Sequence, residues 1–249
     1  MAAPERLRVL IVDDEELARR GLRRDLAAAP EIEVLAECPD GFDAVRASAE
    51  LQPDLVLLDI QMPRLNGFEV LEMLDPGIAV IFITAHDEYA LRAFEVNAVD
   101  YLLKPVDPER LRKALDRARE RIRRHEPMPV AALTAAIRPA GTPSTRVLVR
   151  DGARVHVIPV EAIDYVEAQD DYVAVHVGGR THLKQQTIAA LESGLDPQRF
   201  IRIHRSYILN LDRLDRIELY AKDSRVVILR DGTRLPLSRA GHARLRGML

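Results

Sequence analysis

Five residues in the first half of the chain have side chains that could handle a phosphoryl group. Each follows or ends a short apolar segment, and in chain order they are Asp13, Asp14, Asp59, Thr84 and Lys104. A carboxylate can act as a nucleophile or bind a divalent cation, while hydroxyl and ammonium groups can bind phosphoryl oxygens. Whether these groups work together depends on whether the fold brings them to one place.

The apolar segments before these residues alternate with helical patterns, which predicts a parallel α/β sheet. We expect strands at 9–12, 32–37, 54–59, 78–84 and 101–103, and helices at 17–26, 41–51, 67–74, 88–96 and 108–124. The segments Leu55–Leu58 and Ile78–Ile83 are apolar throughout, as is typical of central strands covered on both faces. We predict a flavodoxin-like, five-stranded parallel sheet of order 2-1-3-4-5, with strands one and three adjacent at the switch point.

This strand order predicts that Asp13 and Asp14 lie beside Asp59 at the carboxyl edge of the sheet. Three neighbouring carboxylates repel one another unless a cation lies among them, and a set of oxygen donors suits Mg²⁺. Simple structural roles are the alternative, since the aspartates could cap helices, Thr84 could end a strand and Lys104 could extend to solvent. Because all five converge on one edge, we favour a site where Asp59 attacks phosphorus and Thr84 and Lys104 bind the remaining oxygens.

Four motifs in this half resemble the signature motifs of two-component receiver domains: Ile11–Glu15, Leu57–Pro63, Ile83–Ala85 and Tyr101–Pro105. The resemblance covers residues 7 to about 124. It implies that Asp59 is the phosphoacceptor and that Mg²⁺ is bound by Asp14, Asp59 and the backbone carbonyl of Gln61, with Asp13 acting through water. A cis peptide bond between Lys104 and Pro105 is also implied.

The same resemblance assigns a switch to Thr84 and Tyr101. Phosphorylation would draw Thr84 toward the phosphoryl oxygens, and Tyr101 would turn into the space that Thr84 leaves. The fourth helix, fifth strand and fifth helix would then form a dimerising face. The alternative for Tyr101 is an ordinary strand aromatic residue with its hydroxyl in solvent.

Composition limits the class of protein. The chain of 249 residues has room for two ordinary domains, and its single cysteine, Cys38, excludes an internal disulfide. No apolar run is long enough to span a bilayer, and the first residues lack the pattern of a signal peptide, so we expect a cytoplasmic protein with no membrane partner. Residues 1–124 carry 18 Lys and Arg against 25 Asp and Glu, whereas residues 125–249 carry 18 against 14. The basic second half is compatible with a polyanionic partner or with ordinary variation in surface charge.

A segment rich in proline, residues 125–145, separates two halves of different periodicity. We interpret it as a linker between a domain at 1–124 and a domain at 146–249. The second domain is expected to begin with a β-hairpin at 147–158, closed by an Asp151–Gly152 turn. Eight further short strands are expected at 163–167, 172–177, 181–184, 200–203, 207–209, 214–220, 224–229 and 234–237, and helices at 188–193 and 239–248. This pattern predicts a mainly β domain.

Basic and hydrogen-bonding residues gather at the strand ends of this second domain, where β scaffolds commonly bind partners. They are Lys184, Arg205, Lys222 and Arg239, with Gln169 and Asp171 in a polar loop. Arginine can bind a guanine edge through two hydrogen bonds, and lysine binds phosphates. These residues alone leave DNA-binding loops and simply solvated loops equally open, and no helix-turn-helix pattern is present.

Three segments of the second half resemble the LytTR family of DNA-binding domains: Ile163–Tyr172, Phe200–Asn210 and Leu235–Arg239. The resemblance covers about 145–249 and implies an elongated, mainly β fold that inserts loops into successive major grooves. Matched by position, the residues implied to contact bases are Asp171, Arg205 and Arg239. Asp171 would have to accept a hydrogen bond from a cytosine amine. We expect His204 to be a buried structural residue.

Together the two resemblances predict a response regulator that acts in signalling rather than as an enzyme. A sensor histidine kinase would phosphorylate Asp59, and the protein would dimerise, bind paired half-sites on double-stranded DNA and control transcription. One alternative is a phosphohydrolase that turns over through an aspartyl phosphate, although haloacid-dehalogenase-like phosphatases use an Asp-x-Asp motif, which Asp13–Asp14 is not. Another is a receiver whose second domain binds protein or RNA.

Overall fold

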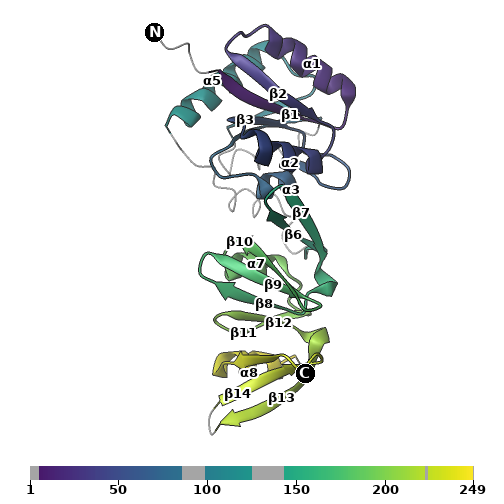
Figure 1. The fold of residues 1–249 in the computed structure, drawn as a ribbon, viewed down its shortest axis with the longest axis vertical. Helices are drawn as coiled ribbons and strands as arrows, with labels where there is room; N and C mark the ends of the chain where they lie inside the picture. Colours follow the sequence, from purple (N-terminus) through teal and green to yellow (C-terminus); the bar gives the residue numbers. More distant parts are fainter. Residues whose placement is uncertain (1–5, 86–98, 125–142, 222–223, 249) are drawn as a thin grey trace. The chain divides into compact units, whose positions relative to one another are not determined.

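The computed structural model describes residues 6–85, 99–124, 143–221 and 224–248. The chain forms two compact units, the first built mainly from residues up to Ala140 and the second mainly from His156–Leu249 (Figure 1). The helix expected at 88–96, most of the expected linker and Lys222 lie outside the described residues.

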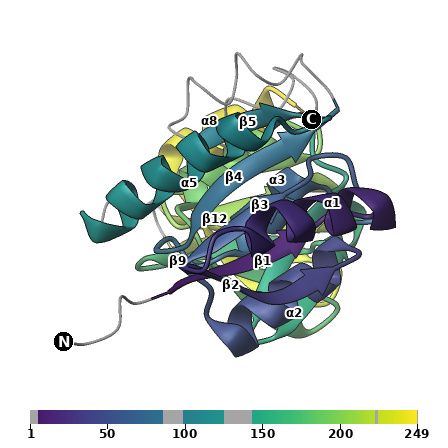
Figure 2. The same ribbon diagram turned by 90° about the horizontal axis from the view of Figure 1, so that it is seen from above.

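The first unit contains a five-stranded sheet whose order is β2-β1-β3-β4-β5, with all neighbouring strands parallel (Figure 2). This confirms the predicted topology. Val12 pairs with Leu58 at the carboxyl ends of the two adjacent strands β1 and β3, so the residues that follow them leave the sheet side by side. The strands are β1 (Leu7–Val12), β2 (Ile32–Cys38), β3 (Leu55–Leu58), β4 (Ala79–Thr84) and β5 (Asp100–Leu103).

The structure describes four helices in this unit. They are α1 (Glu16–Ala27), α2 (Gly41–Leu51), α3 (Gly67–Met73) and α5 (Pro108–Arg123). Asp40 caps α2, Asn66 forms a capping box with Glu69 at α3, and Asp107 caps α5 ahead of a first-turn proline. No side chain caps α1, and Asn66 rather than Asp59 caps α3, so the acidic residues after β1 and β3 do not serve as helix caps.

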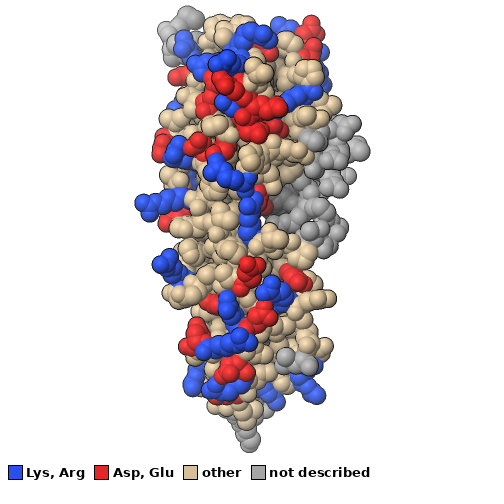
Figure 3. All heavy atoms as spheres, turned by 90° about the vertical axis from the view of Figure 1, so that its right-hand side faces the viewer, with Lys and Arg blue, Asp and Glu red and all other residues tan. Residues whose placement is uncertain are grey.

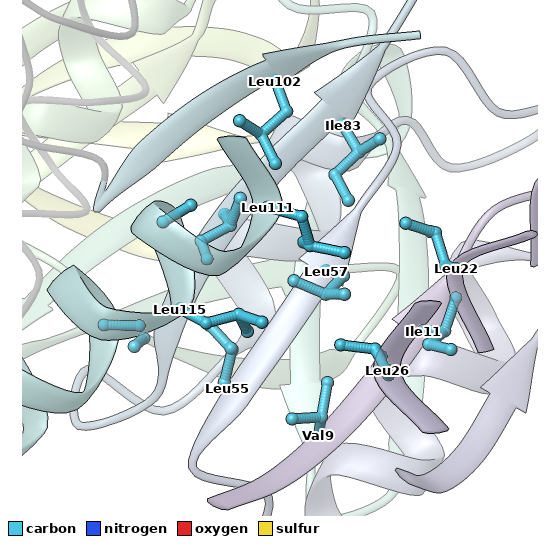
Figure 4. Close-up of a cluster of buried hydrophobic side chains, with 14 of the residues drawn as sticks. Val9, Ile11, Leu22, Leu26, Leu55, Leu57, Ile83, Leu102, Leu111 and Leu115 are labelled. Atoms are coloured by element: carbon cyan, nitrogen blue, oxygen red, sulfur yellow. The ribbon is translucent and has the colours of Figure 1, made fainter. Parts of the chain in front are cut away.

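Both faces of this sheet are covered, which explains why β3 and β4 are buried along their whole length. One face packs against apolar side chains of α1 and α5, as Figure 4 shows for Leu22, Leu26, Leu111 and Leu115. The opposite face is covered by α2, which packs against β1, β2 and α3. This closed core holds the strand ends that carry the acidic residues.

The second unit is mainly β, as predicted. A hairpin is formed by β6 (Arg146–Asp151) and β7 (Arg154–Pro159). An antiparallel sheet of order β10-β9-β8-β12-β11 consists of β8 (Tyr165–Gln169), β9 (Tyr172–Val177), β10 (Arg180–Gln185), β11 (Phe200–His204) and β12 (Tyr207–Asn210). A third sheet contains β13 (Leu214–Ala221), β14 (Ser224–Leu229) and β15 (Arg234–Leu237), and the helices are α7 (Ile188–Gly194) and α8 (Arg239–Arg246).

One strand begins later than the sequence suggests. The segment Val160–Ala162 forms a 3₁₀ turn in which the Ile163 amide donates to the Val160 carbonyl, so β8 starts at Tyr165 rather than at Ile163. The five-stranded sheet of the second unit lies between two apolar clusters. One cluster also contains side chains of the hairpin and α7, and the other contains side chains of the three-stranded sheet and α8. Among the described residues, no helix is long and apolar enough to cross a membrane.

Candidate functional site

Three carboxylates meet at the carboxyl ends of β1 and β3. One oxygen from each of Asp13, Asp14 and Asp59 lies within 4.8 Å of the others. The Asp59 amide donates to the carbonyl of Val12 (2.9 Å), which continues the β1–β3 pairing and places Asp59 beside the acidic loop. Asp13 and Asp59 are buried, whereas Asp14 is exposed. The cluster therefore has two anchored carboxylates and one that faces solvent.

Lys104 extends from the end of β5 into this cluster. Its Nζ lies 2.7 Å from Asp13 Oδ2, 2.8 Å from Asp59 Oδ2 and 3.2 Å from Glu15 Oε2. Its side chain is only 14 % exposed, so it does not extend to solvent. The Lys104 amide donates to the Thr84 carbonyl (2.8 Å), and the peptide bond to Pro105 is cis, as predicted. These restraints hold the ammonium group between two carboxylates.

The electrostatics of the cluster favour cations. Burial alone would lower the pKa of Lys104, but hydrogen bonds to Asp13 and Asp59 outweigh it and raise the pKa above its ordinary value of 10.5. Burial raises the pKa of Asp13, and the hydrogen bond from Lys104 only partly offsets this effect. One ammonium group thus faces three carboxylates, and the all-oxygen donor set fits the ligand preference of Mg²⁺.

Thr84 and Tyr101 lie on neighbouring strands at the same edge of the sheet. Thr84 is fully buried at the end of β4, where it pairs with Leu103 of β5. Tyr101 is 5 % exposed and pairs with Phe82, so little of this residue contacts solvent. This burial disagrees with the alternative of an aromatic residue with its hydroxyl in solvent.

The second unit brings the five candidate residues that the structure describes to one end of its five-stranded sheet. Gln169 pairs with Tyr172 across the β8–β9 turn, and Tyr172 pairs with Gln185, the neighbour of Lys184. The Ala168 amide donates to the Ser206 carbonyl (2.8 Å), which joins that turn to the β11–β12 turn and to Arg205. Gln169, Asp171, Arg205 and Arg239 are exposed, and Lys184 is half-buried.

Helix α8 brings Arg239 to the same end. Both the amide and the hydroxyl of Ser238 donate to the Ile203 carbonyl (3.0 and 2.9 Å), and the hydroxyl also caps the helix at the Gly241 amide. A Cβ on Gly241 would lie 1.9 Å from the Ile203 carbonyl oxygen, so only glycine allows this contact. Arg239 therefore begins α8 close to the turn that carries Arg205.

Known proteins decide the family. The response regulator receiver domain model matches residues 9–116, and the LytTr DNA-binding domain model matches residues 153–249. An uncharacterised response regulatory protein of Yersinia pestis is 40 % identical over 236 residues, which is 94 % of each chain. The transcriptional regulatory protein BtsR of Escherichia coli K12 is 36 % identical and covers 94 % of this chain and 95 % of its own. The sensory transduction protein LytT of Bacillus anthracis is 34 % identical, covering 98 % of this chain and 99 % of its own.

The chain belongs to the response regulators with a LytTR DNA-binding domain. Both predicted families and the fold of each domain are confirmed. The roles of individual residues, the metal ion and dimerisation stay predictions. Figure 3 shows Lys and Arg side chains interspersed with Asp and Glu over the face it presents.

Three residues that support the receiver cluster escaped the sequence analysis. Arg19 of α1 donates to the carbonyls of Asp13 (2.8 Å) and Asp14 (3.2 Å), and Glu15 pairs with Lys104. A Cβ on Gly67 would lie 2.3 Å from the Asp59 carbonyl oxygen. The only signal for Gly67 was its place after Asn66, at the start of the helix expected at 67–74.

Two further residues stand out in the LytTR domain. Tyr172 is 44 % exposed at the end of the sheet that carries the candidate DNA contacts, and its place as the first residue of β9 was the available signal. Arg202 bonds to the backbone of the β11–β12 turn, which no pattern in the sequence predicts. His204 is half-buried rather than buried as expected, and its Nδ1 accepts a hydrogen bond from the Ser206 amide (3.2 Å), which is compatible with the expected structural role.

Proposed function

We propose that this protein is a phosphorylation-activated transcription regulator in which Asp59 receives a phosphoryl group from a sensor histidine kinase. The observation that carries the proposal is the position of Asp59 Oδ2, 2.8 Å from Lys104 Nζ within the cluster of three carboxylates. A structural ion pair with Lys104 would need only one carboxylate. Here the carboxylates of Asp13 and Asp14 also lie within 4.8 Å of Asp59. The protein acts as a signalling protein rather than as an enzyme with its own substrate.

In this proposal the chemistry at Asp59 is nucleophilic displacement at phosphorus. A carboxylate oxygen of Asp59 attacks, an acyl phosphate forms, and the imidazole of the kinase histidine leaves. Lys104 and the Thr84 hydroxyl bind two phosphoryl oxygens and stabilise their charge. Asp13, Asp14, Asp59 and the carbonyl of Gln61 would hold Mg²⁺, with Asp13 acting through water, and the ion would neutralise charge as the phosphoryl group arrives.

The charge added at Asp59 would act through residues that already contact the site. Thr84 and Lys104 are joined by a backbone hydrogen bond at the ends of β4 and β5. Movement of Thr84 toward the phosphoryl group would repack Tyr101 on the neighbouring strand and change the surface of β5 and α5. We propose that this surface and the fourth helix then form the interface of a homodimer. The fourth helix lies outside the described residues.

In this proposal the LytTR domain binds double-stranded DNA and the protein works in the cytoplasm. Arg205 and Arg239 would bind guanine edges, Gln169 and Asp171 would contact other base edges, and Lys184 would bind phosphate. Their common position at one end of the five-stranded sheet supports this assignment. A dimer would present two such ends to paired half-sites.

The phosphoacceptor is tested by labelling with acetyl phosphate and Mg²⁺, followed by intact-protein mass spectrometry. Asp59→Asn should abolish the added phosphate. The matched control is Asp54→Asn, because Asp54 lies just before the opposite end of β3 and accepts a hydrogen bond from the Arg8 amide (2.8 Å). Full labelling of the Asp59 variant contradicts the proposal, and multiple turnover of a phosphate ester would favour a phosphohydrolase.

DNA recognition is tested by selecting duplexes from a random pool at several salt concentrations. Arg205→Ala or Arg239→Ala should weaken binding to the enriched sequence by about 1–3 kcal/mol for each lost bidentate contact. The matched control is Arg199→Ala, because Arg199 precedes the other end of β11 and pairs with Asp212. The DNA-binding proposal is contradicted if no duplex sequence is enriched, or if parallel assays detect binding only to RNA or to protein.

A further inference from the structure

The turn between β11 and β12 must keep one backbone conformation if Arg205 is to select a base. Arg205 is exposed at the tip of this turn, and a long exposed side chain has many rotamers. The register of β11 against β12 shifts between Arg202 and His204, which marks a bulge immediately before the turn. Bulges direct side chains away from the regular ladder, but they also leave backbone carbonyls without ladder partners.

Arg202 binds two carbonyls of the turn that follows this bulge. Its Nε donates to the His204 carbonyl (2.9 Å), and its Nη2 donates to the Arg205 carbonyl. Its Nη1 donates to Glu192 Oε2 of α7 (2.8 Å). The Arg202 side chain is 17 % exposed. One planar guanidinium group therefore joins two successive carbonyls of the turn to a helix on the body of the domain.

We propose that Arg202 is a positioning residue for DNA recognition, which fixes the β11–β12 turn so that Arg205 meets its base in one geometry. The inference rests on the proposed DNA-binding function. Lysine cannot replace Arg202 in this role, because a single ammonium group does not span two carbonyls and a carboxylate in the fixed fork of a guanidinium. Glu192 orients the guanidinium and supplies the opposite charge that a half-buried cation needs.

A direct phosphate contact is the competing role for an arginine at this end of the sheet. The hydrogen bonds argue against it, since Nε, Nη1 and Nη2 are all directed at acceptors within the domain. The two roles also differ in a measurable way. Loss of a phosphate contact weakens binding to all sequences and lowers the salt dependence, whereas loss of a positioning contact removes sequence preference.

The experiment compares the full-length protein with the variants Arg202→Lys, Glu192→Gln, Arg205→Ala and the double variant Arg202→Lys with Arg205→Ala. Affinities are measured for the enriched duplex and for a scrambled duplex of the same length. Arg202→Lys should lower the ratio of the two affinities at least tenfold, and Glu192→Gln should lower it less. Affinity for the scrambled duplex and the salt dependence should change less than twofold.

The double variant separates positioning from a general loss of folding. If Arg202 acts through Arg205, Arg202→Lys should have almost no further effect on the affinity ratio once Arg205 is alanine. Hydrogen exchange, followed by mass spectrometry over residues 200–208, should be faster in Arg202→Lys without DNA. The inference is overturned if Arg202→Lys keeps the wild-type affinity ratio. It is also overturned if Arg202→Lys weakens binding to both duplexes equally and lowers the salt dependence, or if it lowers the affinity ratio of the double variant as much as it does with Arg205 present.

The design also distinguishes failure of the inference from failure of the proposed function. If Arg205→Ala leaves the affinity ratio unchanged, Arg205 does not contact a base, and the proposed interface is wrong at that residue. If Arg205→Ala lowers the ratio and Arg202→Lys does not, the interface stands and the positioning role is wrong. Unchanged hydrogen exchange in Arg202→Lys would overturn the role of Arg202 in the turn whatever the DNA result.

Discussion

Gly67 is the residue whose substitution most directly tests the architecture of the receiver site. It is the first residue of α3, and a Cβ at this position would lie 2.3 Å from the Asp59 carbonyl oxygen and 2.9 Å from Ile60 Cα. Both are backbone atoms, so no side-chain rotation can relieve the overlap. Restoring an ordinary contact requires α3 and the segment after β3 to separate by roughly 1 Å.

Gly67→Ala should therefore destabilise the receiver domain by about 1–3 kcal/mol, the usual cost of overpacking. For a domain of this size the midpoint of thermal unfolding should fall by roughly 4–12 °C. Gly21→Ala is the matched control, because Gly21 lies inside α1 and a Cβ added there would have no neighbouring atom within 4 Å. The same chemical change there should stabilise the domain by about 0.5–1 kcal/mol through helix propensity.

The assay is urea unfolding of both variants, with and without Mg²⁺. A bound ligand adds stability that grows with its concentration relative to its dissociation constant, so the Mg²⁺-dependent gain reports the acidic cluster. Displacement of the Asp59 backbone should make that gain smaller in Gly67→Ala and leave it unchanged in Gly21→Ala. If Gly67→Ala unfolds at the wild-type urea concentration with the full Mg²⁺ gain, the packing argument is refuted.

Three further predictions concern the LytTR domain. Gly241→Ala should weaken binding to the enriched duplex at least tenfold, because its Cβ would lie 1.9 Å from a carbonyl oxygen of β11. Gly247→Ala is the control, since its Cβ would have no neighbour closer than 3.4 Å, and equal affinities of the two variants would contradict the prediction. Asn210 is fully buried and makes two backbone hydrogen bonds (2.6 and 3.0 Å), so Asn210→Ala should cost about 1–3 kcal/mol in urea unfolding, and a cost near zero would show that the bonds are replaceable. Burial lowers the pKa of His176 below 6.5, although Glu167 acts in the opposite direction, so the unfolded chain takes up a proton first and stability is lost as pH falls below 6.5. His176→Gln should reduce that loss between pH 7.5 and pH 5, measured by urea unfolding, and an unchanged pH dependence would contradict the assignment.

The receiver site was predictable because its residues sit at strand ends that follow unmistakable apolar segments. In a parallel sheet the carboxyl ends of adjacent strands share one edge, so the strand order alone predicted that Asp13 and Asp59 meet. The contacts that refine the site were not predictable in this way. Arg19 reaches the acidic loop from the first turn of α1, and Lys104 contacts two carboxylates at once because its backbone is held by Thr84.

In the LytTR domain the sequence patterns predict the strands but not the order of the strands in the sheet. Alternating apolar residues predicted its strands, but they do not specify which turns lie side by side, since the order β10-β9-β8-β12-β11 places strands distant in the sequence next to one another. The β8–β9 and β11–β12 turns meet through a hydrogen bond between Ala168 and Ser206, and α8 approaches through Gly241. Arg202 was missed because its acceptors are backbone carbonyls of the β11–β12 turn, and the residue types in the sequence do not show where such carbonyls lie.

Lys104 explains how the receiver can hold three neighbouring carboxylates and still respond to a phosphoryl group on one of them. Its ammonium group lies between Asp13 and Asp59, which balances part of the cluster's charge. In the proposed mechanism a phosphoryl group on Asp59 presents oxygens that carry more negative charge than the carboxylate, so the same ammonium group gains by shifting toward them. The Lys104 amide is bonded to the Thr84 carbonyl, and Tyr101 lies three residues earlier on β5. In this mechanism a shift of Lys104 therefore reaches the β4–β5 edge, where the proposed switch residues lie, through the backbone hydrogen bond to Thr84.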